Sequence, residues 1–144
     1  MSRWQALLSG AIEPGVYRLP ARTSAEAVRR AVAPAGWRVF VIEGDKVSDK
    51  GTFLSEAARA MDFPSYFGKN WDAFEDSLND LEWAPAKGYV ILYPHAERFG
   101  RLPDWKTVLS IFQVAVRRWQ QAGVPMYIFL GGLNGALAQL EQSP

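Results

Sequence analysis

The sequence predicts an α/β fold built on a parallel β-sheet. Three short apolar runs, at 37–42, 89–93 and 126–130, have the length and residue types of buried strands, and segments with helical periodicity separate them. Strands separated by helices pair in parallel through right-handed crossovers. The runs are apolar almost throughout, which is typical of a sheet covered by helices. Hydrophobic residues make up 49% of the 144 residues, which is enough for a packed core in one domain of common size.

Three helices are expected within this core, over residues 51–61, 70–80 and 104–121. The first and last stop at residues that end helices, Pro64 and Gly123. Each segment has apolar residues at helical spacing. In the longest segment these residues are Trp105, Val108, Leu109, Phe112, Val116 and Trp119.

An N-terminal extension, residues 1–36, precedes this core. It contains an expected strand at 15–19 and an expected helix over 24–33. The extension could add a strand to the sheet, cover the sheet, or form a second binding surface. The predicted organisation is therefore an extension over 1–36 followed by a domain over 37–144. A short helix over 133–140 is expected at the end of this domain.

Composition excludes several classes of protein. The chain has no cysteine, so disulfides, thiolate catalysis and thiolate metal sites are excluded. Near the start, the apolar run Ala6-Leu7-Leu8 is too short for a secretory signal. No stretch approaches the roughly 18 apolar residues needed to cross a bilayer. We expect a cytoplasmic protein that does not act on membranes.

Charge is unevenly distributed along the chain. The formal net charge is only +1. From Asp62 to Glu82, however, the sequence has six acidic residues and a single base, Lys69. A local acidic patch can steer a cationic partner even when the whole molecule is nearly neutral.

The expected helix over 70–80 has an acidic face formed by Asp72, Glu75, Asp76 and Asp80. Asp72 and Asp76 are four residues apart, and such like-charge pairs destabilise a helix by about 0.2–0.5 kcal/mol. The helix dipole offsets this cost for Asp72 in the first turn, but hardly for Asp76. A locally unfavourable row indicates a function such as binding a cationic surface. A simple solvated face is the alternative reading.

The opposite face of this helix is apolar, and an aromatic loop precedes it. Asn70 is a good N-cap, and Tyr66 and Phe67 lie just before Gly68. We expect one of these two aromatic side chains to be buried. The residues expected to face the core are Trp71, Phe74, Leu78 and Leu81.

The run Tyr66-Phe67-Gly68-Lys69-Asn70-Trp71-Asp72-Ala73 resembles the signature of the barstar family: an aromatic pair, Gly, any residue, Asn, an apolar residue, Asp and Ala. Asp76, Leu78 and Trp83 fit the family pattern as well. The order of strands and helices from Trp37 to Leu130 also matches, so the resemblance covers about two-thirds of the chain.

The resemblance implies a two-layer α/β fold with a three-stranded parallel sheet, to which the extension adds a strand and a helix. It also implies a non-enzymatic inhibitor, a monomer when free, that blocks a barnase-like ribonuclease. Asp76 would be the main phosphate mimic, Asp72 a second acidic contact and Tyr66 the aromatic contact of the loop. The residues expected to bind the partner are Tyr66, Phe67, Gly68, Asn70, Trp71, Asp72, Ala73, Glu75, Asp76 and Asp80.

Two positions of the motif depart from the prototype inhibitor. Lys69 stands where the prototype has an acid, and Glu75 stands where it has an aromatic residue. These departures favour a target other than barnase itself. A regulatory or scaffolding protein that uses the acidic face on a non-nuclease partner is the alternative function.

Other chemistries have weaker support. His95 is the only histidine, and no nucleophile or metal ligand set accompanies it. A hydrolase using Asp72, Glu75 and Asp76 as acid and base would need carboxylates on opposite walls of a cleft, whereas these three are expected on one exposed helix face. The glycines from Gly131 to Gly135 lack the full dinucleotide or Walker pattern. The basic residues form no dense patch for nucleic acid. We therefore expect no catalytic residue, metal or cofactor.

Overall fold

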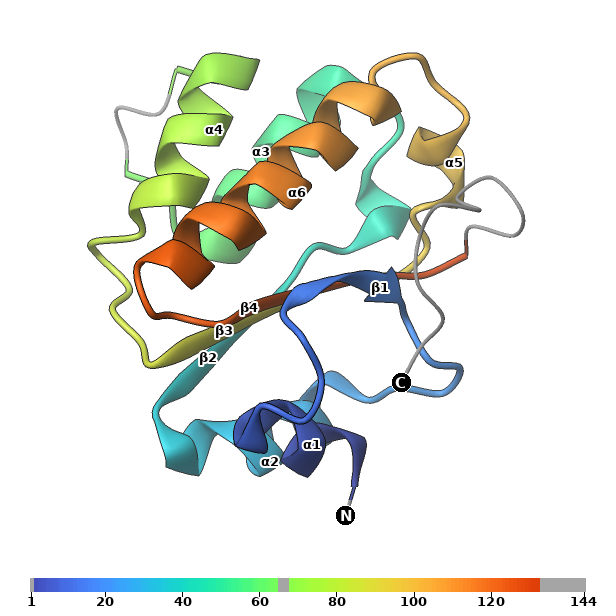
Figure 1. Ribbon diagram of the computed structural model, residues 1–144. Coiled ribbons are helices and arrows are strands. Elements are labelled where there is room, and N and C mark those ends of the chain that lie inside the picture. The colour runs from blue at the N-terminus through green and yellow to red at the C-terminus, as the bar shows by residue number, and fades with distance from the viewer. Residues whose placement is uncertain (1, 65–67, 133–144) are drawn as a thin grey trace.

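A parallel four-stranded sheet with helices on both faces forms the structure (Figure 1). The computed structural model describes residues 2–64 and 68–132. The strands, given in their spatial order, are β1 (Gly15–Arg18), β4 (Met126–Leu130), β3 (Gly88–Tyr93) and β2 (Trp37–Val41). All neighbouring strands pair in parallel, which confirms the predicted fold class. The sheet has one strand more than the three of the predicted core, because β1 of the extension hydrogen-bonds to β4.

The helices lie in two groups. The larger group covers one face of the sheet and comprises α3 (Lys50–Met61), α4 (Trp71–Asp80), α5 (Glu97–Gly100) and α6 (Trp105–Gln121). Helices α1 (Arg3–Ser9) and α2 (Ala25–Val32) cover the other face (Figure 1). The two-layer arrangement thus describes the part from β2 onward, and the extension adds a third layer. The division of the chain at residue 36 stays a prediction.

Burial on the two faces explains the sequence pattern of the strands. Every residue of β3 and β4 is buried, because both strands are central and helices cover both of their faces. The larger core lies under α3, α4 and α6 and is rich in aromatic residues, with Phe53 packed against Phe74 at 5.3 Å between ring centroids. The smaller core joins Val28 and Val32 of α2 to Tyr127 and Phe129 of β4.

The helix predictions for 24–33, 51–61, 70–80 and 104–121 agree with α2, α3, α4 and α6 to within one residue at each end. Two α-helices of the described residues were missed. Helix α1 has seven residues and α5 has four, so neither shows a sustained apolar period. The sequence signals for α1 were Ser2 followed by Gln5, which form a capping box, and Gly10, which ends the helix in a left-handed conformation. The helix predicted over 133–140 lies outside the described residues.

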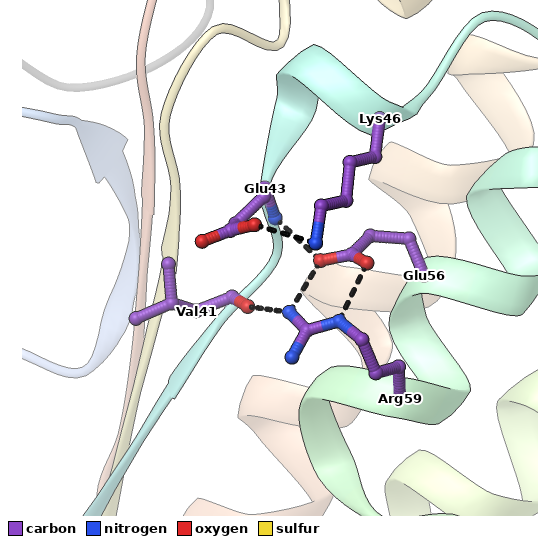
Figure 2. A network of polar contacts seen from close by, with 5 residues as sticks. All are labelled: Val41, Glu43, Lys46, Glu56 and Arg59. Atoms are coloured by element: carbon purple, nitrogen blue, oxygen red, sulfur yellow. Dashed lines mark hydrogen bonds and ion pairs between the residues drawn. The ribbon is translucent and has the colours of Figure 1, made fainter.

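A polar network ties the end of β2 to α3 (Figure 2). Glu56 of α3 is buried, with 4% of its surface exposed. Its carboxylate accepts hydrogen bonds from Arg59 Nε at 2.7 Å, Arg59 Nη2 at 2.6 Å and the backbone N–H of Glu43 at 2.8 Å. Arg59 also donates to the carbonyl of Val41, the last residue of β2, at 3.2 Å. The network thereby fixes α3 relative to the edge strand.

The carboxyl group of Glu56 couples folding to pH. Burial disfavours its charged form, but the hydrogen bonds from Arg59 and the Glu43 backbone outweigh that effect and hold the pKa below its usual value. A lowered pKa in the folded state stabilises the protein above the usual glutamate pKa of about 4.3. This contribution is lost as the pH falls through the lowered pKa. Urea unfolding between pH 7 and pH 3 should therefore show a steeper loss of stability for the wild type than for Glu56→Gln. Equal slopes would contradict this.

Removing Arg59 should destabilise the fold. In Arg59→Ala the buried Glu56 carboxylate loses its bidentate partner, and we expect the free energy of unfolding to fall by about 2 kcal/mol. Arg29→Ala, an exposed site on α2, is the matched control and should change stability by less than about 0.5 kcal/mol. Chemical denaturation of both variants at pH 7 measures the difference, and an equal loss in the two would show that the network contributes nothing.

Candidate functional site

Helix α4 begins at Trp71, directly after Asn70, the N-cap that the sequence predicted. The Asn70 side chain accepts a hydrogen bond from the Ala73 backbone N–H at 2.7 Å, which caps the helix. Lys69 before it adopts a left-handed conformation with φ of 52°, and Gly68 is exposed. Tyr66 and Phe67, predicted as the aromatic contacts of the loop, lie outside the described residues.

Two tryptophan hydrogen bonds secure the far end of α4. Trp119 Nε1 of α6 donates to the carbonyl of Leu78 at 2.9 Å. Trp83, just after α4, donates from Nε1 to the carbonyl of Met61 at the end of α3, at 2.8 Å. Leu81 ends the helix in a left-handed conformation and is itself buried. Helix α4 is therefore held against both of its neighbours.

The inward face of α4 packs as the apolar spacing predicted, with one difference. Phe74 and Leu78 are completely buried and Leu81 nearly so. Trp71 is only half-buried, although its ring packs against Phe53 at 6.0 Å between centroids. The ammonium of Lys50 lies 5.3 Å from the centroid of the Trp71 ring, a cation–π contact at the start of α4.

The acidic face of α4 points away from this core. All four of its carboxylate side chains, Asp72, Glu75, Asp76 and Asp80, are exposed. Within residues 2–64 and 68–132, none of them takes part in an ion pair; the three ion pairs of this part of the chain join other residues. Helix α4 also has no basic residue in its last turn. No ion pair of the described residues thus neutralises the carboxylates of this face, and their charge is available to a partner.

A groove beside the acidic face was not anticipated from the sequence. It lies between α4 and α6 and has a volume of about 380 Å³. The residues that line this α4–α6 groove are Trp71, Asp72, Glu75, Lys106, Thr107, Ser110 and Ile111. Lys106, Thr107 and Ser110 stand some thirty residues after α4, so no local pattern could have placed them beside it.

The structure thus brings the described members of the predicted site together on α4 and its N-terminal cap. Asp72, Glu75, Asp76 and Asp80 form its exposed surface. Ala73 is half-buried, and its backbone serves the Asn70 cap. Whether these side chains contact a partner stays a prediction.

The alternative sites are poorly formed. His95 is exposed, and the nearest acid is Glu97, with 3.9 Å between Nδ1 and Oε1. In the described part of the chain, no three acidic or histidine side chains could hold a metal ion, and no helix is long and apolar enough for a membrane crossing. The Glu97 carboxylate lies beside the backbone of Gly132, where a Cβ would come within 2.0 Å of it. A carboxylate at this place would repel a phosphate at the Gly131-Gly132 turn.

The cap of α4 can be tested by substitution. Asn70→Ala removes the acceptor for the Ala73 N–H and should lower the free energy of unfolding by about 1 kcal/mol. Asn70→Asp keeps an acceptor at the same place and is the control, expected to be near neutral. Urea denaturation compares the two. If both lose the same stability, the side-chain cap does not stabilise α4.

Comparison with known proteins agrees with this architecture. A family model described as Barstar (barnase inhibitor) matches residues 37–131. The match runs from β2 to the end of β4 and includes the whole of α4 and the α4–α6 groove. A comparison with curated proteins found no match. Because the family model covers well over half of the sequence, the chain belongs to the barstar family, whose model describes barnase inhibitors.

Proposed function

We propose that this protein inhibits a ribonuclease by placing the acidic face of α4 in the nuclease active site. The observation that carries the proposal is the row of exposed carboxylates without ion pairs in the described structure, in a chain that belongs to a family of inhibitors. A ribonuclease active site binds phosphates through cationic side chains. Carboxylates spaced one helical turn apart can take the positions of those phosphates.

Asp76 is the main phosphate mimic in this proposal, and Asp72 is the second. Asp76 lies in the middle of α4, where the helix dipole does little to stabilise a negative charge. The pair therefore weakens the isolated helix, and binding to a cationic surface is the function that offsets this cost. Tyr66 and Phe67 would extend the contact from the loop.

The rigidity of α4 favours tight binding. Its N-terminus is capped by Asn70, and its C-terminal end is held by the hydrogen bonds from Trp83 and Trp119. An acidic face that is ordered before binding loses less conformational entropy on association than a flexible segment would. We propose that the protein protects the cytoplasm of a cell that produces the nuclease, and that it has no catalytic activity of its own.

Asp76→Ala should weaken inhibition more than any other single substitution on α4. Truncation of one partner of a buried charge pair in an interface costs about 2 kcal/mol or more, which corresponds to at least about a 30-fold increase in the inhibition constant. Glu26→Ala removes the same charge from exposed α2, on the opposite face of the sheet, and is the control. Titration of each variant against a panel of bacterial ribonucleases measures the effect.

Added salt should slow association of the wild type, because exposed charges steer the encounter. Two results would refute the proposal. One is a wild-type protein that inhibits no ribonuclease of the panel, which would favour a regulatory or scaffolding partner. The other is an Asp76→Ala variant that inhibits as well as the wild type.

A further inference from the structure

We infer that Lys106 is a specificity determinant and that the target nuclease places a carboxylate side chain against it in the α4–α6 groove. This inference rests on the proposed function and concerns the same surface. It predicts that the target is cationic where it meets the acidic face but carries an aspartate or glutamate beside that cationic centre.

The first observation is the position of Lys106. Its side chain is exposed and lines the α4–α6 groove together with Asp72 and Glu75. In the described structure, no ion pair within 4.0 Å joins Lys106 to either acid. The groove therefore presents separate positive and negative charges to a partner. A partner that covers Asp72 must also come close to Lys106.

The second observation is that Lys106 is unfavourably placed in its own helix and, among the described residues, makes no ion pair. It lies in the first turn of α6, where the positive end of the helix dipole disfavours a cation. The same turn has no acidic residue, and Asp104 makes no side-chain hydrogen bond as N-cap. The first turn of α6 therefore offers Lys106 no acidic partner of its own. A residue that is unfavourable for its own helix and lines a groove of the proposed site is better explained by recognition.

Charge complementarity then determines the kind of group that Lys106 meets. A nuclease surface that is cationic throughout would place like charges together at this point, which costs several kcal/mol in an interface. A carboxylate would instead form a charge-assisted hydrogen bond with the lysine Nζ. The hydroxyl groups of Thr107 and Ser110, which also line the groove, could donate to the same carboxylate. Lys106 would thus select against nucleases that lack this acid.

The test compares two charge reversals on α6, measured with the nuclease that the wild type inhibits best. Lys106→Glu should raise the inhibition constant by at least about tenfold. Arg117→Glu changes the net charge by the same amount on the same helix, but Arg117 is exposed near the C-terminal end and does not line the groove. It should change the constant by less than about threefold. Thermal unfolding should show little change in stability for Lys106→Glu, because the new acid suits the helix N-terminus and this offsets its repulsion by Asp72 and Glu75 across the groove.

A charge swap adds a second arm. Replacing the acids around the nuclease active site with lysine, one at a time, should identify one variant that Lys106→Glu inhibits better than the wild type does. The inference is overturned if Lys106→Glu inhibits the native nuclease as well as or better than the wild type, or if no swap restores inhibition. If the Lys106 tests fail in this way but Asp76→Ala still weakens inhibition, only the inference about Lys106 is wrong and the proposed function is retained. If the wild type inhibits no ribonuclease, both fail.

Discussion

Burial of Phe74 and Leu78 determines the direction in which α4 faces. Both side chains are fully buried beneath the helix, among the aromatic residues of α3 and α6. Burying two such side chains contributes several kcal/mol, about 1.5–3 kcal/mol for each, which exceeds the repulsion among the acids on the other side. The acidic face is therefore exposed because the opposite face is held in the core, and the two tryptophan hydrogen bonds add to that hold.

The acidic residue Glu56 of α3 and the acidic residues of α4 have different surroundings. Glu56 is buried and fully paired, and its contacts join α3 to the edge of the sheet. The acids of α4 are exposed and, in the described structure, make no ion pair. The first arrangement serves stability and the second leaves charge available for a partner. This contrast within adjacent helices is the main physical support for an inhibitory surface on α4.

The N-terminal extension adds an edge strand to the sheet and covers the face opposite α4. Strand β1 pairs with β4, and α1 and α2 cover the face that α3 and α6 leave open (Figure 1). The hydroxyl of Tyr127 in β4 donates to the carbonyl of Ile12, which links this layer to the centre of the sheet. The extension thus shields apolar strand residues such as Val90 and Phe129, and it lies on the opposite face from the proposed binding surface.

The sequence by itself determined the four strands, the four longer helices and the Asn70 cap, because alternation, helical period and capping chemistry are local properties. It also identified the acids of α4, whose spacing is contained in one helix. It could not reveal that Glu56 is buried, since a charged residue on a helix is normally exposed, nor that Lys106 lies across a groove from Asp72. The tertiary structure alone decided these features, because they arise where segments distant in the chain pack together.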